Sequence, residues 1–376
     1  MPCSYHLRCK TDLNGENSVF TNLKKLILTS PLILLTLSTG CSKGDDTGET
    51  GNTTETGSTT ETGNTTETGS TTETGTTFTP PSSDAFSSFT IDSRRSRIQQ
   101  FSEEFTPGLT VTLDSGSTVT IAGNLLDSDG HIVQGSVDLE VIELTSRGDM
   151  ISSVMSTMGV DENGDKSALI SGGEHYVNVT QNGEQLTLQG EYRVHVLASL
   201  TGGLDMEMDL FVPEDESAGL EDAVDWSLVD MDRKMGTGGE GSDAYYWLSS
   251  STFGWTNVDK WNNDPRDKTR IQVSVPAGFD DQNSVIYLTY DGEPTALALL
   301  DVYDENSGLF TEHYGMLPIG LEMHVIFLSV DEDNDQWLYH ILPETVDEDE
   351  TIAFDDVSAM TTGTEADLLA AIEALP

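Results

Sequence analysis

The sequence predicts an all-β protein in which a disordered tether precedes two antiparallel β-sandwich domains, and one short helix ends the chain. Two observations lead to this fold class. Between about residues 84 and 343, apolar and polar residues alternate in short runs, which is typical of strands with one buried face. Clusters of Asp, Asn, Ser and Gly separate these runs, as expected of β-turns.

The N-terminal part of the chain has the pattern of a secretory signal. Lys24 and Lys25 precede an apolar run that spans residues 26–37, and small residues lead from there to Cys41. A cationic head, a short apolar core and small residues before a cleavage point are typical of such signals. We therefore expect residues 1–40 to be a signal region, of which residues 1–22 reflect a misassigned translation start.

Residues 41–83 read as a tether. The hexads Glu-Thr-Gly-Asn-Thr-Thr and Glu-Thr-Gly-Ser-Thr-Thr repeat along this segment, and no apolar residue lies between Ser42 and Thr77. Such a segment has nothing to bury, so it cannot offset the entropy lost on ordering. Fully extended, residues 42–82 would reach about 140 Å. We expect a flexible stalk whose function is to let the folded domains extend away from the N-terminal anchor.

The first sandwich is expected over residues 84–213. Alternating apolar residues mark its strands in residues 109–113, 137–141 and 204–210. Asn182-Gly183 predicts a hairpin, because both central positions of a type I′ turn need positive φ. No amphipathic helix of normal length is expected in this domain.

The second sandwich is expected over residues 244–343, after an interdomain segment at residues 214–243 in which the alternation lapses. An acidic tail follows at residues 344–376. Within it, residues 365–375 form the one helix that the sequence predicts. Thr364 is placed as its N-cap, and Asp367 three residues later completes a capping box.

The charge balance excludes one class of partner. The chain has 65 acidic and 17 basic residues, for a formal net charge of -48. Nucleic-acid binding relies on Lys and Arg neutralising phosphates, so no nucleic-acid partner is expected. The excess carboxylate is explained either by a saline habitat or by binding of divalent cations. Of Cys3, Cys9 and Cys41, only Cys41 survives removal of the signal region, so no disulfide is expected.

The end of the signal region resembles the lipobox of bacterial lipoproteins, in which the cysteine is acylated. With the tether and two β modules, the chain is similar to uncharacterised tethered outer-membrane lipoproteins of Gram-negative bacteria, of the bacteroidete and myxobacterial types. Residues 170–174 (Ile-Ser-Gly-Gly-Glu) and 253–259 (Phe-Gly-Trp-Thr-Asn-Val-Asp) add to the likeness. The resemblance implies a lipidated Cys41, Ig-like or carboxypeptidase-regulatory-like sandwiches, and a cell outer membrane location that is surface-exposed or, alternatively, periplasm-facing.

Three acidic turns are the candidate metal sites. Each places side-chain oxygens at alternate positions, as calcium loops do. They comprise Asp127 and Asp129; Asp161, Asn163 and Asp165; and Asp331, Asp333 and Asp335. None completes an EF-hand, and the alternative is that β-turns simply use Asp, Asn and Gly. Calcium is therefore the one cofactor considered, and no cofactor is certain.

Aromatic and histidine residues supply the other candidates. Exposed tryptophans would form a stacking surface for sugars, whereas buried ones would form the core; the residues concerned are Trp247, Trp255, Trp261 and Trp337. His324 and His340 flank the last acidic turn. If paired residues in that hairpin sum to 666, both histidines lie on one face as diagonal neighbours, close enough for a metal pair, and a register one residue different separates them. The alternative is that they are unrelated surface or core histidines.

These observations predict a lipid-anchored, non-enzymatic envelope protein that displays binding modules for a protein or glycan partner at the cell surface. The alternatives are an envelope hydrolase or other enzyme with an acidic or divalent-metal site, and a structural surface-layer component. A pocket with converging Asp, Glu and His would favour an enzyme, and an exposed aromatic or apolar patch would favour binding. No catalytic residue is assigned, since the sequence contains no G-x-S-x-G elbow.

Overall fold

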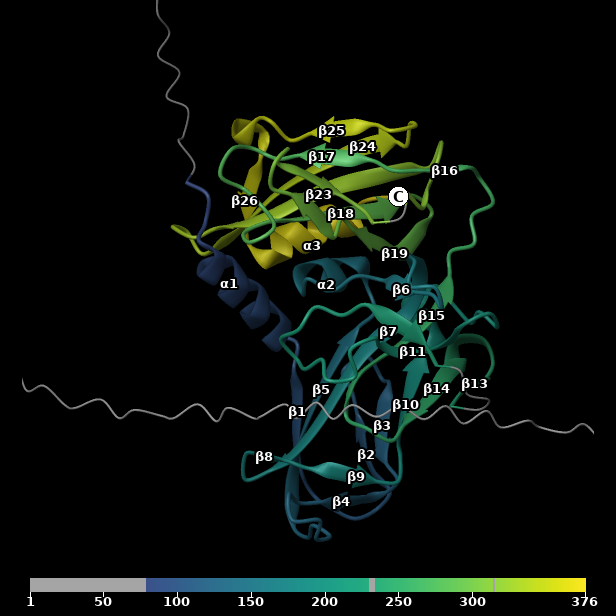
Figure 1. Cartoon of the computed structure of the whole chain (residues 1–376). Coiled ribbons are helices and arrows are strands. Elements are labelled where there is room, and N and C mark those ends of the chain that lie inside the picture. Colours follow the sequence, from purple (N-terminus) through teal and green to yellow (C-terminus); the bar gives the residue numbers. More distant parts are fainter. Residues whose placement is uncertain (1–78, 230–233, 314) are drawn as a thin grey trace, which may run out of the picture. The chain divides into compact units, whose positions relative to one another are not determined.

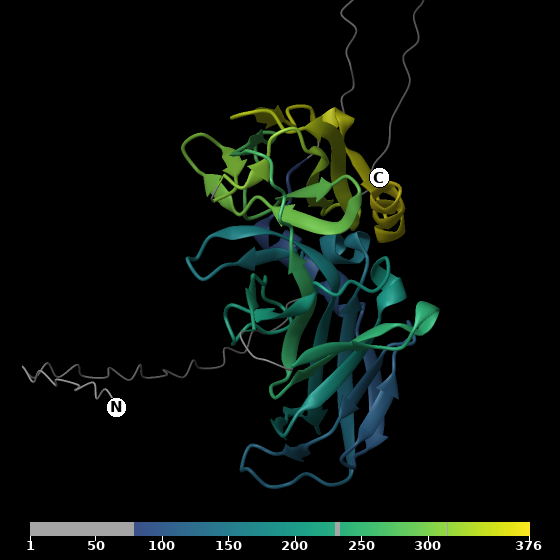
Figure 2. The ribbon, with the colours of Figure 1, turned by 90° about the vertical axis from the view of Figure 1, so that its right-hand side faces the viewer.

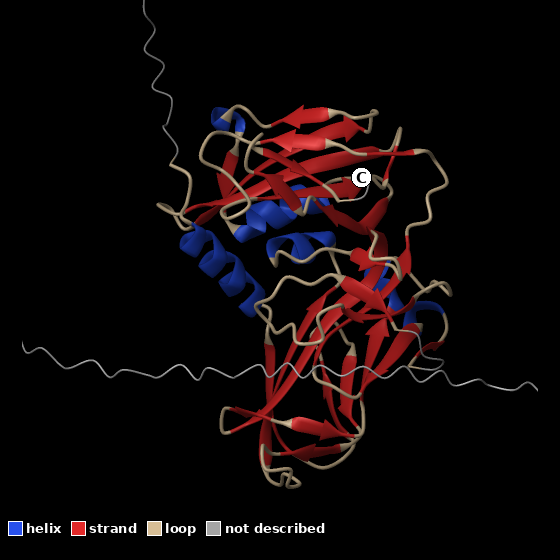
Figure 3. Ribbon diagram, in the orientation of Figure 1, coloured by secondary structure: helices blue, strands red, loops and turns tan. Residues whose placement is uncertain are grey.

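The computed structural model describes residues 79–229, 234–313 and 315–376. The expected signal region, Cys41 and the tether as far as residue 78 lie outside the described residues. The last part of the segment expected to be a disordered tether is ordered, because the Pro81 carbonyl accepts from the Asn283 side-chain amide at 3.1 Å and Ser82 caps the first helix. Within them, strands in several sheets make up most of the structure, and three α-helices accompany them (Figure 3). This confirms the all-β class and the short C-terminal helix.

Two facing sheets and a small third sheet form the first half of the described chain (Figure 1). The larger sheet contains, in spatial order, β1 (Gln99–Glu104), β5 (Ser136–Leu144), β7 (Lys166–Gln181), β15 (Gly254–Trp261), β11 (Asp209–Pro213), β12 (Trp226–Leu228) and β6 (Met158–Val160), and β8 (Glu184–Gln185) pairs with β7. The other contains β13 (Met235–Gly238), β14 (Tyr245–Ser250), β10 (Tyr192–Leu197), β3 (Thr118–Ile121) and β2 (Leu109–Thr112). A two-stranded sheet joins β4 (Asn124–Leu126) to β9 (Thr187–Gln189). Alternating Val and Leu side chains of β5, β7 and β10 fill the core between the two larger sheets.

Three further sheets form the second half. One contains β19 (Glu293–Leu299), β18 (Val285–Tyr290), β23 (Glu322–Asp331), β24 (Gln336–Thr345) and β26 (Thr361–Gly363). A second contains β20 (Val302–Asp304), β21 (Leu309–Thr311), β17 (Gln272–Ser274) and β25 (Thr351–Ala353), and the third pairs β16 (Lys268–Thr269) with β22 (Leu317–Pro318). Their core includes Val273, Phe310 and Phe327.

A third apolar cluster joins the two halves through the three helices, α1 (Ser83–Arg95), α2 (Arg147–Ser152) and α3 (Glu365–Glu373). Tyr176 of β7 and Tyr287 of β18 belong to this cluster, so both halves contribute to it. Leu368 and Ile372 of α3 are fully buried there. Figure 2 shows α3 beside the C-terminal strands. The predicted capping box of α3 is confirmed, because Thr364 and Asp367 cap each other's backbone amides.

The helix α1 was not expected from the sequence. Ser82 caps it by accepting a hydrogen bond from the Ala85 amide at 3.2 Å. Phe86 is buried, and the Phe89 ring meets the Trp337 ring edge-on at 4.9 Å. The remaining inward positions are Thr, Ser and Arg, so the helix has a narrow apolar face and its sequence periodicity is weak.

The domain boundary expected at residue 244 also disagrees with the way the strands pair. β14 pairs with β10, and β15 pairs with both β7 and β11. Both strands therefore belong to the first pair of sheets, and the segment read as interdomain contributes β12 and β13 to the same sheets. Alternation identifies a strand but does not identify its partner, which is set by contacts remote in sequence.

Two hairpins test the sequence predictions directly. Asn182 and Gly183 have φ values of +54° and +81°, which confirms the predicted positive-φ turn. In the hairpin of β23 and β24, His324 lies opposite Pro343 and His340 lies opposite Phe327. Paired numbers thus sum to 667 and not to 666. The two histidines therefore lie on opposite faces, and the predicted metal pair is excluded.

Candidate functional site

The two sequence segments on which the resemblance rests lie side by side, on β7 and β15. Asn257 pairs with Glu174 and Asp259 pairs with Ser171, and the register shifts between these two pairs. Such an irregularity bends the strand and redirects its side chains. β15 therefore contacts two different polar regions, one at its first residues and one at its middle.

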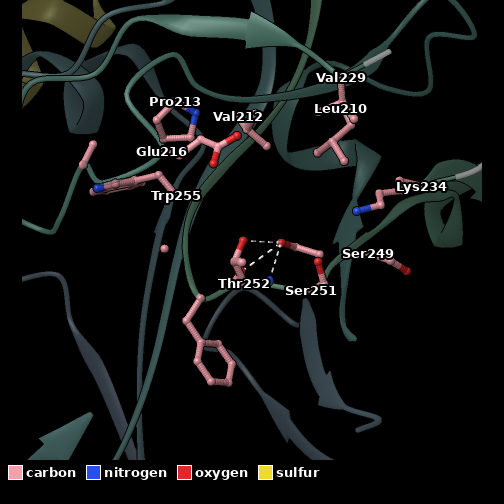
Figure 4. A pocket seen from close by; sticks show the side chains of 14 residues that line it. Leu210, Val212, Pro213, Glu216, Val229, Lys234, Ser249, Ser251, Thr252 and Trp255 are labelled. Carbon is pink, nitrogen blue, oxygen red and sulfur yellow. Dashed lines mark hydrogen bonds between the residues drawn. The ribbon is translucent and has the colours of Figure 1, made fainter. Parts of the chain in front are cut away.

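A pocket of about 350 Å³ opens at the start of β15 (Figure 4). β11 and the loop after it form one side, and the end of β14 with the link to β15 forms the other. The lining residues are Leu210, Val212, Pro213, Glu216, Ala218, Val229, Lys234, Ser249, Ser250, Ser251, Thr252, Phe253, Gly254 and Trp255. The pocket thus combines an apolar wall, a row of hydroxyl groups and two opposite charges.

Local hydrogen bonds shape the hydroxyl side of the pocket. The Ser250 hydroxyl donates to the Thr252 carbonyl at 2.8 Å, and the Thr252 amide donates back to the Ser250 oxygen at 3.2 Å. Gly254 has φ of +131°, a conformation that side chains disfavour. This tight link leaves Ser251 and Thr252 exposed at the rim.

The apolar wall is fixed by packing. Trp255 is only 3% exposed, its indole N–H donates to the Gly219 carbonyl at 3.0 Å, and its ring lies 5.2 Å from that of Tyr176. Leu210 accepts the Val229 amide at 2.9 Å through its carbonyl. Because these side chains are already held in place, the wall is preformed.

Two charged side chains, Lys234 and Glu216, line the pocket. No carboxylate or carbonyl within the described ranges pairs with the Lys234 ammonium. The other Lys and Arg side chains in those ranges each make an ion pair or hydrogen bond, for example Lys166 with Asp301 at 2.6 Å and Lys260 with Asp205 at 2.6 Å. Figure 4 shows Lys234 and Glu216 on opposite sides of the pocket. An ammonium that no described group neutralises is available to an anionic ligand.

A closed polar cluster lies at the middle of β15, and the sequence did not reveal it. Glu174, Asp259, Asn257 and Ser171 are all fully buried. Asn257 donates to the Asp259 carboxyl at 2.7 Å and accepts from the Ser171 hydroxyl at 3.0 Å. Both Glu174 oxygens lack a hydrogen-bond partner among the described residues.

The two carboxyls of this cluster favour their neutral form. Burial raises the pKa of Glu174 well above its usual value, and the nearby Asp259 raises it further, while Arg94 opposes the shift. Burial likewise raises the pKa of Asp259 well above its usual value. The cluster has no path to solvent, so we interpret it as structural.

Arg94 of α1 closes the cluster from the helical side. Its guanidinium donates to the carbonyls of Ser153 at 2.8 Å and Val154 at 3.2 Å, and to those of Leu220 and Asp222, both at 2.7 Å. One buried cation thereby joins α1, the end of α2 and the loop that precedes β12. Burial lowers the pKa of Arg94 from its usual value.

The first two candidate calcium turns use their acidic groups locally. Asp127 accepts the amides of Asp129 at 3.0 Å and His131 at 2.8 Å, and the backbone bond from His131 is the main cause that lowers its pKa. In the turn between β6 and β7, the first residue, Asp161, accepts both the Asn163 amide and the Asp165 amide. This is the hydrogen-bonding pattern of an Asx-turn.

The third turn, between β23 and β24, is similar. Asp331 accepts the side-chain amide of Asn334 at 2.7 Å, Asp333 lies in the turn itself, and Asp335 has φ of +55°. Within the described ranges, no group of three or more His, Cys, Asp or Glu side chains is placed to hold a metal ion. These contacts favour the alternative that Asp and Asn serve the turns themselves, and calcium binding stays an untested hypothesis.

The four candidate tryptophans do not form one surface. Trp337 is fully buried, and Trp261 packs edge-on against Phe211 at 5.6 Å. Trp247 is half-buried beneath the Arg193 guanidinium at 5.3 Å. Of the four, Trp255 lines the pocket at the start of β15. Alternation predicted where these rings lie along strands, but their exposure depends on the strand partners.

The candidate histidines are also engaged separately. His324 lies 2.8 Å from the Asp291 carboxylate through Nδ1, and the His340 ring contacts the Phe354 ring at 5.5 Å. No helix in the described part of the chain is long and apolar enough to cross a membrane. No family model matches this chain, and the comparisons with curated proteins and with solved structures likewise find no match.

Proposed function

We propose that this chain is a lipid-anchored cell-envelope protein whose folded part is a binding module for a protein or glycan partner at the cell surface. The pocket at the start of β15 is the observation that carries the proposal. Its volume of about 350 Å³ is typical of sites that enclose a small ligand or one residue of a larger partner. Its wall is preformed, which reduces the ordering cost of binding.

The sequence supports the envelope location. The signal pattern ends at Cys41, and the resemblance to lipoproteins implies acylation there. One acyl chain binds a membrane weakly, and stable anchoring needs a second chain or signal. The repeat tether would then hold the module on the order of tens of ångströms from the lipid.

The groups in the pocket suit binding more than catalysis. Nucleophilic catalysis by a hydroxyl requires a neighbouring base, usually a histidine or a carboxylate within hydrogen-bond reach. None of the described lining residues is a histidine, and no hydrogen bond within the described ranges joins Glu216 to a lining serine. The hydroxyls, Lys234 and Glu216 are instead arranged as separate contacts for a polar ligand.

Protease shaving of intact cells tests the location. Release of a fragment that spans the folded residues 83–376, while a periplasmic control protein survives, is the result we expect. Protection of the fragment until the outer membrane is broken would contradict surface display and place the module in the periplasm.

A pocket-filling variant tests the binding site. Thr252 lies exposed at the rim, so Thr252→Trp should preserve the fold while its indole occupies the pocket. We expect this variant to lose retention on an array of envelope glycans and peptides. Thr110→Trp, at an exposed position of β2, is the matched control and should bind as the unmodified chain does. Equal binding by Thr252→Trp would show that the site lies elsewhere.

A further inference from the structure

We propose that the group bound in this pocket is an acidic sugar residue, a hexuronic acid by chemical class, with its carboxylate on Lys234. This inference rests on the proposed function and names the ligand class of the same pocket. It draws on three features of the lining: the unpaired ammonium, the hydroxyl groups with Glu216, and the apolar wall.

Lys234 is the cation of the described pocket lining, and it places a positive charge where an anion could bind. With a net charge of -48, the protein repels anions over most of its surface. The Lys234 backbone is tied to β14, because its carbonyl accepts the Ser249 amide at 2.7 Å. The side chain therefore starts from a fixed point at the pocket edge. A carboxylate bound there would form a charge-assisted hydrogen bond with a cation that no described group neutralises.

The hydroxyl side of the pocket matches a polyol. Ser251 and Thr252 are exposed there, and each hydroxyl can both donate and accept hydrogen bonds. Glu216, on the side of the pocket opposite Lys234, can accept hydrogen bonds from two neighbouring sugar hydroxyls. An alkyl carboxylate would bind Lys234 but would leave these groups without partners, which costs free energy where water is displaced.

The apolar wall completes the match. Val212, Pro213 and Trp255 offer a hydrocarbon surface to the C–H face of a sugar ring. Because Trp255 is almost fully buried, it acts as part of this wall and not as an open stacking platform. A neutral sugar would use the wall and the hydroxyls but would leave Lys234 unpaired. Only a ligand that is both a polyol and a carboxylate uses all three features.

Isothermal titration of the purified full chain with five probes tests the inference. The probes are glucuronate, galacturonate, glucose, galactose and octanoate. We expect at least one uronate to bind about tenfold or more tightly than its neutral sugar, a difference of about 1.4 kcal/mol. Octanoate should bind more weakly than that uronate.

Variants that remove one positive charge test whether Lys234 causes the preference for the uronate. Lys234→Gln should remove the preference for the uronate over its neutral sugar. Lys260→Gln is the matched control, because Lys260 is paired with Asp205 and does not line the pocket; it should keep the preference. Circular dichroism of each variant confirms that it is folded.

The outcomes separate the inference from the proposed function. Equal binding of uronate and neutral sugar, or a preference that survives Lys234→Gln, would overturn the acidic-sugar assignment while leaving a pocket that Thr252→Trp still blocks. Tighter binding of octanoate would assign the pocket to alkyl carboxylates instead. No binding of any probe overturns the inference, and continued array binding by Thr252→Trp overturns the proposed site itself.

Discussion

The two polar regions along β15 differ in their access to solvent. At the middle of the strand, Asp259 of β15 and Glu174 of the neighbouring strand β7 are sealed from water and favour bound protons. At the start of the strand, Ser251, Thr252 and Lys234 line an open pocket. In the sealed region Asn257 bonds to Asp259 and Ser171, while both Glu174 oxygens are buried without a hydrogen-bond partner among the described residues. The open region instead leaves hydrogen-bonding groups exposed to a ligand.

This difference teaches how to tell structural polar groups from functional ones by their geometry. Polar residues are abundant here, with 65 carboxylates in the sequence, so residue type alone is uninformative. Burial without a path to solvent indicates a structural role. A preformed pocket with an unpaired charge indicates a binding role. Four predictions test this distinction, from the largest expected effect to the smallest.

Removing the Arg94 guanidinium, which lies beside the sealed region, should have the largest effect on stability. Arg94→Met removes the donor from four carbonyls, of which the bond to Ser153 is buried and the other three are partly buried, and we expect a loss of about 3–5 kcal/mol in the free energy of unfolding. Arg95→Met is the control, since Arg95 forms an exposed ion pair with Glu221 and should cost less than about 1 kcal/mol. Urea denaturation of the full chain measures both. Equal losses would contradict a structural role for the sealed region.

The sealed carboxyls should make stability depend on pH in a defined direction. A carboxyl whose pKa is raised on folding stabilises the fold while protonated, so stability falls as pH rises from the unfolded pKa toward the folded one. Glu174→Gln removes this loss. At about pH 8 the variant should be more stable than the unmodified chain by about 1–3 kcal/mol, and at about pH 4 the difference should shrink.

Thermal unfolding across pH measures that difference, and Glu184→Gln is the matched control at an exposed position of β8. Its unfolding curve should follow that of the unmodified chain at every pH. If Glu174→Gln did the same, the carboxyl would not be held neutral in the folded state, and the sealed region would have to be solvated.

In the open region, the same kind of substitution should cost little stability. Lys234→Gln removes no ion pair of the described residues, so we expect a change within about 0.5 kcal/mol. Lys166→Gln breaks contacts with Asp225 at 2.8 Å and Asp301 at 2.6 Å, and should cost about 1 kcal/mol. Chemical denaturation compares the two. A larger loss for Lys234→Gln would mean that Lys234 serves the fold and not a ligand.

The acidic turns should show the smallest effect. Asp161 already accepts two amides of its own turn, so its carboxylate is engaged without a metal. We expect added calcium to change the free energy of unfolding of the unmodified chain by less than about 0.5 kcal/mol, so the melting temperature should stay nearly constant. A rise with calcium that Asp161→Asn abolishes would instead establish a metal site in this turn.

Features encoded by neighbouring residues could be predicted from the sequence. The all-β class followed from alternation, the positive-φ turn from Asn182-Gly183, and the C-terminal helix from Thr364 and Asp367. Each depends on contacts within a few residues. For the same reason, strands were expected from residue 244 onward, although the sheets to which the first of them belong were not predicted.

Features set by distant contacts could not be predicted. The inward face of α1 uses Thr90, Ser93 and Arg94, which become buried only because other elements pack over them. The pocket requires β14 and β15 to join the first pair of sheets, which alternation does not specify. The His324–His340 hypothesis depended on a register that differs by one residue, and that shift reversed its outcome.

Amide hydrogen exchange of the full chain, measured with and without glucuronate, compares the two regions most directly. We expect the amides of residues 250–254 to exchange fast in the free protein and to slow on ligand addition, because they line the open pocket. The amides of residues 171–175 and 257–259 should exchange slowly in both states. Protection confined to another surface, or ligand-dependent change at residues 171–175 without change at residues 250–254, would contradict the assignment of the open region as the binding site.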